Sequence, residues 1–124
     1  MSPAGSSATP ASDTAALQAM VQPIVHDAKS TTTAFDQGDQ SAAAVGLTRI
    51  GQVGATVLAW LDAHPDFERA NQGGTACLRE TMTDLGEQAQ DLPAELRAGS
   101  ASPEQITKLR RDLAEAASCI QSGD

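Results

Sequence analysis

The most patterned polar residues of the chain are acidic and recur at helical spacing: Glu80, Asp84, Glu87, Asp91 and Glu95. On a helix, the first four side chains fall within about 60° of arc. Apolar residues of the same segment lie roughly opposite them: Leu78, Met82, Leu85 and Ala89. Aligned like charges repel by about a few tenths of a kcal/mol each. The first four form an acidic ridge. It is either a solvated face, offset by Arg79, Lys108, Arg110 and Arg111, or a surface that docks a basic protein. The docking surface gives these four as the candidate partner-binding residues.

Two histidines, His26 and His64, are the only imidazoles. His64 lies between Asp62 and Asp66, so an imidazole and carboxylates that suit a divalent cation come together there. Alternatively, His64 interacts with the dipole at a helix C-terminus, and Asp66 caps the helix that follows. His64, Asp62 and Asp66 are therefore weak candidates for a metal site, and we predict no bound cofactor.

The sequence lacks the motifs of common enzyme classes. It has no G-x-S-x-G elbow, no phosphate-binding glycine loop and no HExxH motif, so we expect a protein that binds rather than catalyses. A net charge of −8 opposes binding to nucleic acid. Two Phe, one Trp and no Tyr also provide few surfaces on which bases could stack.

The segment Trp60-Leu61-Asp62-Ala63-His64-Pro65, followed by an acidic residue, resembles part of the small helical haemophore-like proteins of mycobacteria, which are exported and carry haem. The resemblance covers only this segment. Haem ligation in that family would use Tyr or His, and the absence of Tyr departs from its pattern. The resemblance therefore implies an alternative function, a haem or metal carrier that uses His64. Its pocket would be shaped by Trp60 and a glycine-lined helix face: Gly46, Gly51 and Gly54.

Helices must position these residues, because the chain is rich in Ala and poor in alternating apolar patterns. We predict a first helix from Ser12 or Asp13 to about Gln37-Gly38, with a kink or break at Pro23. A second helix begins after Asp39 or Ser41 and ends at His64, before Pro65. The three glycines in this second helix indicate either close approach of a neighbouring helix or space for a ligand.

The sequence of the second half of the chain predicts two further helices. Residues 66–92 form either one long helix or a short helix over 66–71 and a restart capped by Thr75. Pro93 interrupts this helix and a short turn follows over 94–98. Ser102-Pro103-Glu104-Gln105 then opens the last helix with a capping box. The expected fold is an all-α, up-down four-helix bundle, with the extra short helix over 66–71 left open.

The two cysteines, Cys77 and Cys119, lie equally far along the sequence from the expected turn near Ala98. In an antiparallel hairpin this symmetry places them side by side, so we predict a disulfide. The bridge closes a loop of about 43 residues and contributes roughly 4 kcal/mol. A disulfide indicates an oxidising compartment.

Residues 1–12 are small, polar and proline-spaced, so we interpret them as a disordered tether or a leader remnant. Residues 13–124 form a single domain. The predicted function is an exported binding protein, periplasmic or at the cell surface, and in one version an acidic inhibitor or immunity protein for a basic protein. A membrane is contacted only through the N-terminal tether.

Overall fold

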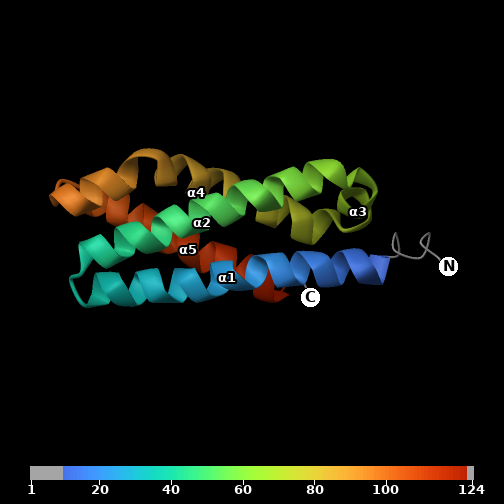
Figure 1. Ribbon diagram of the computed structural model, residues 1–124, viewed down its shortest axis with the longest axis horizontal. Coiled ribbons are helices and arrows are strands. Elements are labelled where there is room, and N and C mark those ends of the chain that lie inside the picture. The colour runs from blue at the N-terminus through green and yellow to red at the C-terminus, as the bar shows by residue number, and fades with distance from the viewer. Residues whose placement is uncertain (1–9, 123–124) are drawn as a thin grey trace.

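The computed structural model describes residues 10–122, with side chains over 13–121, as an all-α bundle (Figure 1). Four long helices pack in up-down fashion, as the sequence predicted, and the short helix that the sequence left open joins the second long helix to the third. The helices are α1 Pro10–Asp36, α2 Gln40–Ala63, α3 Pro65–Ala70, α4 Gln72–Ala98 and α5 Pro103–Ser122. Residues 1–9 of the predicted tether lie outside the described part, and 10–12 belong to α1.

Local signals set most helix ends. α1 ends before Gly38, whose φ of 76° suits glycine. Asp39 caps α2 by accepting a hydrogen bond from the Ala42 amide at 3.0 Å. Ser102 and Gln105 form the predicted capping box, with bonds of 3.1 and 2.8 Å. The α2–α3 and α4–α5 boundaries therefore fall where Pro65 and Pro103 begin new helices.

Neither Pro23 nor Pro93 breaks the helix that contains it. α1 runs unbroken through Pro23, which is exposed, so the carbonyl that loses its helical donor can reach water. The predicted interruption at Pro93 is wrong, because α4 continues to Ala98. Leu92 and Leu96 flank this proline and both are buried. Packing of these two leucines in the core favours continuing the helix over breaking it.

Thr75 does not cap the fourth helix, which begins three residues earlier, at Gln72. Thr75 is buried instead, and its hydroxyl donates to the carbonyls of Asn71 at 2.8 Å and Glu68 at 3.3 Å. The hydroxyl therefore ties the start of α4 to α3.

The central helix of the bundle is α2, which packs against both α1 and α4. By length and mean hydropathy, α2 is the one described helix that could also cross a membrane. Several of its large apolar side chains are fully buried: Leu47, Ile50, Val57 and Leu61. These side chains therefore form part of the core of the bundle.

The three glycines of α2 allow neighbouring helices to approach closely. A Cβ at Gly46 would lie 2.0 Å from the Thr31 hydroxyl of α1. A Cβ at Gly51 would lie 2.6 Å from the Ala89 Cβ, and one at Gly54 would lie 3.3 Å from the Met82 sulfur, both of α4. The expectation that these glycines leave space for a ligand is therefore wrong, because side chains of α1 and α4 cover them.

Cys77 and Cys119 form the predicted disulfide, with their Cα atoms 5.9 Å apart. Cys77 lies in the second turn of α4. Cys119 lies in the last turn of α5. The bridge thus joins α4 and α5 at one end of the bundle.

Candidate functional site

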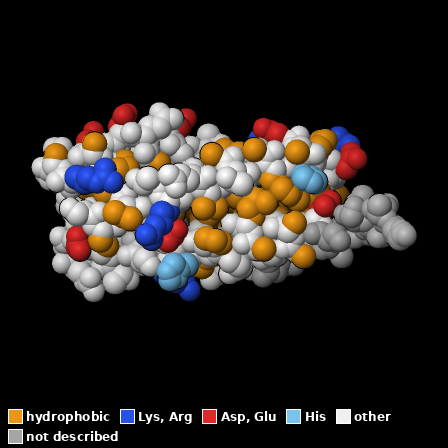
Figure 2. Space-filling view, in the orientation of Figure 1, with side chains coloured by type: hydrophobic (Ala, Val, Ile, Leu, Met, Phe, Trp, Pro, Cys, Tyr) orange, Lys and Arg blue, Asp and Glu red, His pale blue; other side chains and the backbone are white. Residues whose placement is uncertain are grey.

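The acidic ridge of Glu80, Asp84, Glu87 and Asp91 lies on α4, and all four side chains reach solvent. Three of them are exposed and Asp84 is half-buried. Figure 2 shows acidic side chains along the upper edge of the molecule, over α4. On this helix the ridge extends about 16 Å, at about 1.5 Å per residue. It therefore presents a row of negative charge.

Three of the four basic residues that were expected to offset the ridge have other partners. Arg79 pairs with Asp62 at 3.0 Å and with Glu68 at 2.7 Å. Lys108 pairs with Asp112, at 2.9 Å. Two further ion pairs are Arg110–Asp36 at 2.7 Å and Arg49–Asp27 at 4.0 Å.

Consequently, none of the four ridge carboxylates has an ion pair or hydrogen bond among the described side chains. Arg111, the remaining candidate, is exposed and also has no ion pair there. Apart from the longer-range attraction between Asp84 and Lys108, the negative charge of the ridge is left to solvent or to a binding partner.

A buried carboxylate supports the same face of the bundle from α5. Asp112 accepts hydrogen bonds from Lys108 and, at 2.6 Å, from Gln88 of α4. The hydrogen bond to Asp112 raises the pKa of Lys108, and desolvation opposes this rise. The negative charge of Asp84 raises the pKa of Lys108 further, at longer range. Glu95, which shares α4 because the helix continues past Pro93, accepts a bond from Gln105 at 2.7 Å. These contacts fix α4 against α5, and so hold the ridge in position.

His64 lies at the junction of α2 and α3, within an aromatic cluster. Its ring stacks on Trp60, with centroids 3.9 Å apart, and Trp60 meets Phe67 edge-on at 5.2 Å. The Nδ1 atom of His64 lies 2.7 Å from the Trp60 carbonyl. Because a carbonyl only accepts, Nδ1 is the donor in this contact, and Nε2 is the ring nitrogen that remains for another partner.

The carboxylates near His64 are engaged in ion pairs rather than directed at a common metal position. Asp62 pairs with Arg79, and Asp66 pairs with Arg69. Within the described residues, no group of three His, Cys, Asp or Glu side chains is placed to hold a metal ion. His26 is exposed on α1. The structure therefore does not bring the sequence candidates His64, Asp62 and Asp66 together as one ligand set.

The Arg79 network predicts a specific response to acid. The hydrogen bond from Arg79 lowers the pKa of Glu68 below 4.5. Because the pKa of Glu68 is lower in the folded than in the unfolded protein, ionised Glu68 stabilises the fold at pH values above its unfolded-state pKa. This stabilisation is lost as the pH falls through the folded-state pKa. Glu68→Gln is therefore expected to lower the urea midpoint at neutral pH, with the difference from the wild type shrinking below about pH 4.5.

The matched control for this experiment is Glu80→Gln, which removes one negative charge from a side chain without an ion pair in the described structure. It should leave the midpoint near that of the wild type. A Glu68→Gln midpoint equal to the wild type at neutral pH would show that the Arg79 network contributes nothing to stability.

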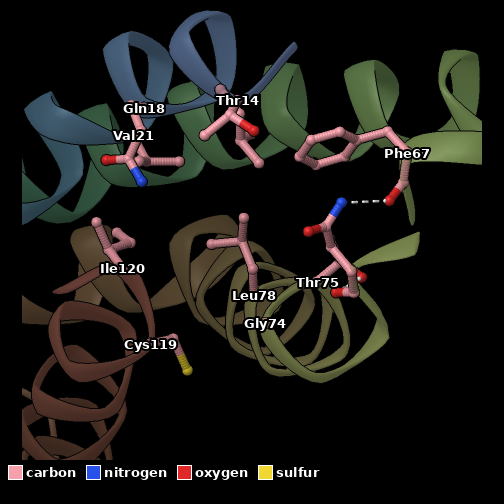
Figure 3. Close-up of a pocket in the computed structure, with 11 residues that line it drawn as sticks. Thr14, Gln18, Val21, Phe67, Gly74, Thr75, Leu78, Cys119 and Ile120 are labelled. Carbon is pink, nitrogen blue, oxygen red and sulfur yellow. Dashed lines mark hydrogen bonds between the residues drawn. The ribbon is translucent and has the colours of Figure 1, made fainter. Parts of the chain in front are cut away.

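A cavity of about 140 Å³ lies at the disulfide end of the bundle, where α1, α3, α4 and α5 meet (Figure 3). Its apolar lining comes mainly from Leu17, Val21, Phe67, Leu78 and Ile120. Its polar lining comes from Thr14, Gln18, Asn71 and Thr75. Sequence reasoning missed this cavity, because its lining residues come from four separate helices and share no motif. No protein-family model matches this chain, and no curated protein or solved structure shows significant similarity to it.

Proposed function

We propose that this protein is a non-enzymatic binding protein whose acidic ridge docks a basic protein partner. The observation that carries the proposal is that the ridge carboxylates have no ion pair within the described part of the chain, while five of the eight basic residues are paired elsewhere. Aligned charges of one sign accelerate encounter with a partner of opposite sign and select against partners of like sign. An inhibitor or immunity protein that covers a cationic toxin or enzyme is the most specific form of this proposal.

Rigid presentation supports such a role. The ridge lies on one continuous helix that is fixed to α5 by the Gln88–Asp112 bond and by the disulfide. A preorganised surface loses less conformational entropy on binding than a mobile one. The row of carboxylates can therefore meet a complementary row of basic side chains without rearrangement of the bundle.

The proposal is tested with a synthetic helical peptide that carries a lysine stripe at the spacing of the ridge. Binding is measured by isothermal titration calorimetry at low and at physiological ionic strength. Changing the four ridge carboxylates together to Gln or Asn is expected to weaken binding about tenfold or more, which is about 1.4 kcal/mol. Added salt should weaken binding of the wild type more than that of the variant.

The control removes the same amount of charge from other helices, by neutralising Asp13, Asp66, Glu104 and Glu115. Circular dichroism establishes that both variants are folded. If the control and ridge variants lose affinity equally, the attraction comes from net charge alone, and the ridge is a solvated face.

An oxidising location outside the cytoplasm, periplasmic or at the cell surface, is part of the proposal. Its support is the disulfide between Cys77 and Cys119, since such bonds persist mainly in oxidising compartments. Thiol labelling of native material, followed by mass spectrometry, tests it. Two free thiols in the cellular protein would contradict export.

A haem carrier that uses His64 is the second candidate. The observation in its favour is the half-buried ring with Nδ1 as the donor to the Trp60 carbonyl, so that Nε2 is the nitrogen that remains for iron. Hemin added to the wild type should then give a Soret band that weakens in His64→Ala and persists in the control His26→Ala. The same spectrum in all three proteins would eliminate this function.

A further inference from the structure

We propose that the cavity at the disulfide end binds a small neutral molecule, about the size of one six-membered ring, that carries a hydroxyl group. The cavity lies between α1, α3, α4 and α5, and no part of the acidic ridge lines it. It is therefore a second binding site, independent of the docking surface proposed above.

The size of the cavity limits the ligand to a few heavy atoms. Its volume is about 140 Å³. Apolar protein cavities of about 150 Å³ hold benzene. A single ring thus fills the available space, whereas a larger ligand would have to extend through the open side into solvent.

The lining determines the charge and polarity of the ligand. None of the lining residues carries a formal charge, so an ionic ligand would have no counter-charge in the site. Apolar side chains from all four helices supply about half of the walls, and polar groups supply the rest. As Figure 3 shows, Phe67 and Leu78 face the cavity across from Val21. A neutral molecule with both an apolar and a polar part is therefore favoured.

Two polar residues of the lining, Asn71 and Thr75, direct a donor at the backbone. The amide nitrogen of Asn71 donates to the Phe67 carbonyl at 2.9 Å, which is the dashed bond of Figure 3. The Asn71 side-chain oxygen has no hydrogen bond in the described structure. The Thr75 hydroxyl proton is likewise directed at backbone carbonyls. A ligand hydroxyl can therefore donate to the free Asn71 oxygen.

The walls are held in place before any ligand binds. Cys119 lines the cavity, and its disulfide fixes α5 to α4. Phe67 is buried, and Trp60 holds its ring edge-on at 5.2 Å. A preformed apolar site with a few convergent polar groups is typical of small-molecule binding.

The probe for this site is phenol, and its binding is monitored by two-dimensional amide NMR of the oxidised protein. Phenol is expected to shift the amide signals of lining residues such as Gly74, Leu78 and Cys119, with a dissociation constant on the order of millimolar. Toluene, which lacks the hydroxyl, should bind more weakly. In Asn71→Ala this preference for phenol should disappear.

The blocking variant is Thr14→Phe, because Thr14 is exposed at the cavity and a large side chain there fills the space without disturbing the core. It should weaken phenol binding about tenfold or more. The matched control is Thr56→Phe, an exposed threonine of α2 that does not line the cavity, and it should bind phenol like the wild type.

Three results would overturn the proposal. The first is the absence of phenol-dependent shifts in the wild type. The second is a set of shifts confined to residues outside the cavity. The third is equal binding by Thr14→Phe and the wild type, provided that their amide spectra show the same fold.

Discussion

Replacing Cys77 and Cys119 together by serine is expected to lower the free energy of unfolding by about 4 kcal/mol. The bond closes a loop with a sequence separation of 42 residues, so its loss restores much conformational freedom to the unfolded chain. Small domains have total stabilities of about 5–15 kcal/mol. Urea unfolding followed by circular dichroism measures the change.

Reduction of the wild type provides the control for this prediction. Wild-type protein treated with a reductant should unfold at about the urea midpoint of the double-serine variant, whereas the variant should not respond to the reductant. A double-serine variant as stable as the oxidised wild type would mean that the disulfide does not stabilise this bundle.

Gly46→Ala is expected to destabilise the protein by about 2 kcal/mol, although alanine is normally the better helix former by about 1 kcal/mol. The added Cβ would lie 2.0 Å from the Thr31 hydroxyl and 3.3 Å from the Thr31 Cβ. Thr31 is itself buried, so the added methyl group would force α1 and α2 apart. Urea unfolding again provides the measurement.

A double-mutant cycle isolates this contact. Thr31→Ala alone should change stability little, because the lost methyl group is offset by removing a buried hydroxyl that has no hydrogen-bond partner among the described residues. In Thr31→Ala, adding Gly46→Ala should cost much less than it does in the wild type.

The control for the glycine itself is Gly86→Ala on α4, where a Cβ would meet nothing within 4 Å. This change should raise stability by about 0.5–1 kcal/mol. If Gly46→Ala and Gly86→Ala stabilise equally, the close approach of α1 to α2 is not needed for the fold.

The parts of the fold that could be predicted from sequence depend on local signals. The side chains of Asp39 and Ser102 each accept a hydrogen bond from the backbone amide three residues later, and both cap the start of a helix as expected. The disulfide was predicted from a hairpin turn near Ala98, and it forms although the connection lies slightly later, between Ala98 and Pro103. The position of the ridge on one face of a helix likewise follows from residue spacing alone.

The remaining features depend on contacts between distant residues. Pro93 was expected to end a helix, but Leu92 and Leu96 hold it in the core, and no local pattern measures that packing energy. The partners of Arg79 lie 11 and 17 residues earlier in the chain. The sequence therefore could not show that the basic residues pair with other carboxylates and not with the ridge. It also could not show the cavity, because four separate helices enclose it.

The position of the disulfide also determines what a protease could separate. A cut between Ala98 and Pro103 would leave two fragments that remain one covalent molecule, because the disulfide joins Cys77 before the cut to Cys119 after it. A cut at Gly38, between α1 and α2, would leave α1 attached only by noncovalent contacts. On a denaturing gel without reductant, the first product would migrate as a single band and the second as two.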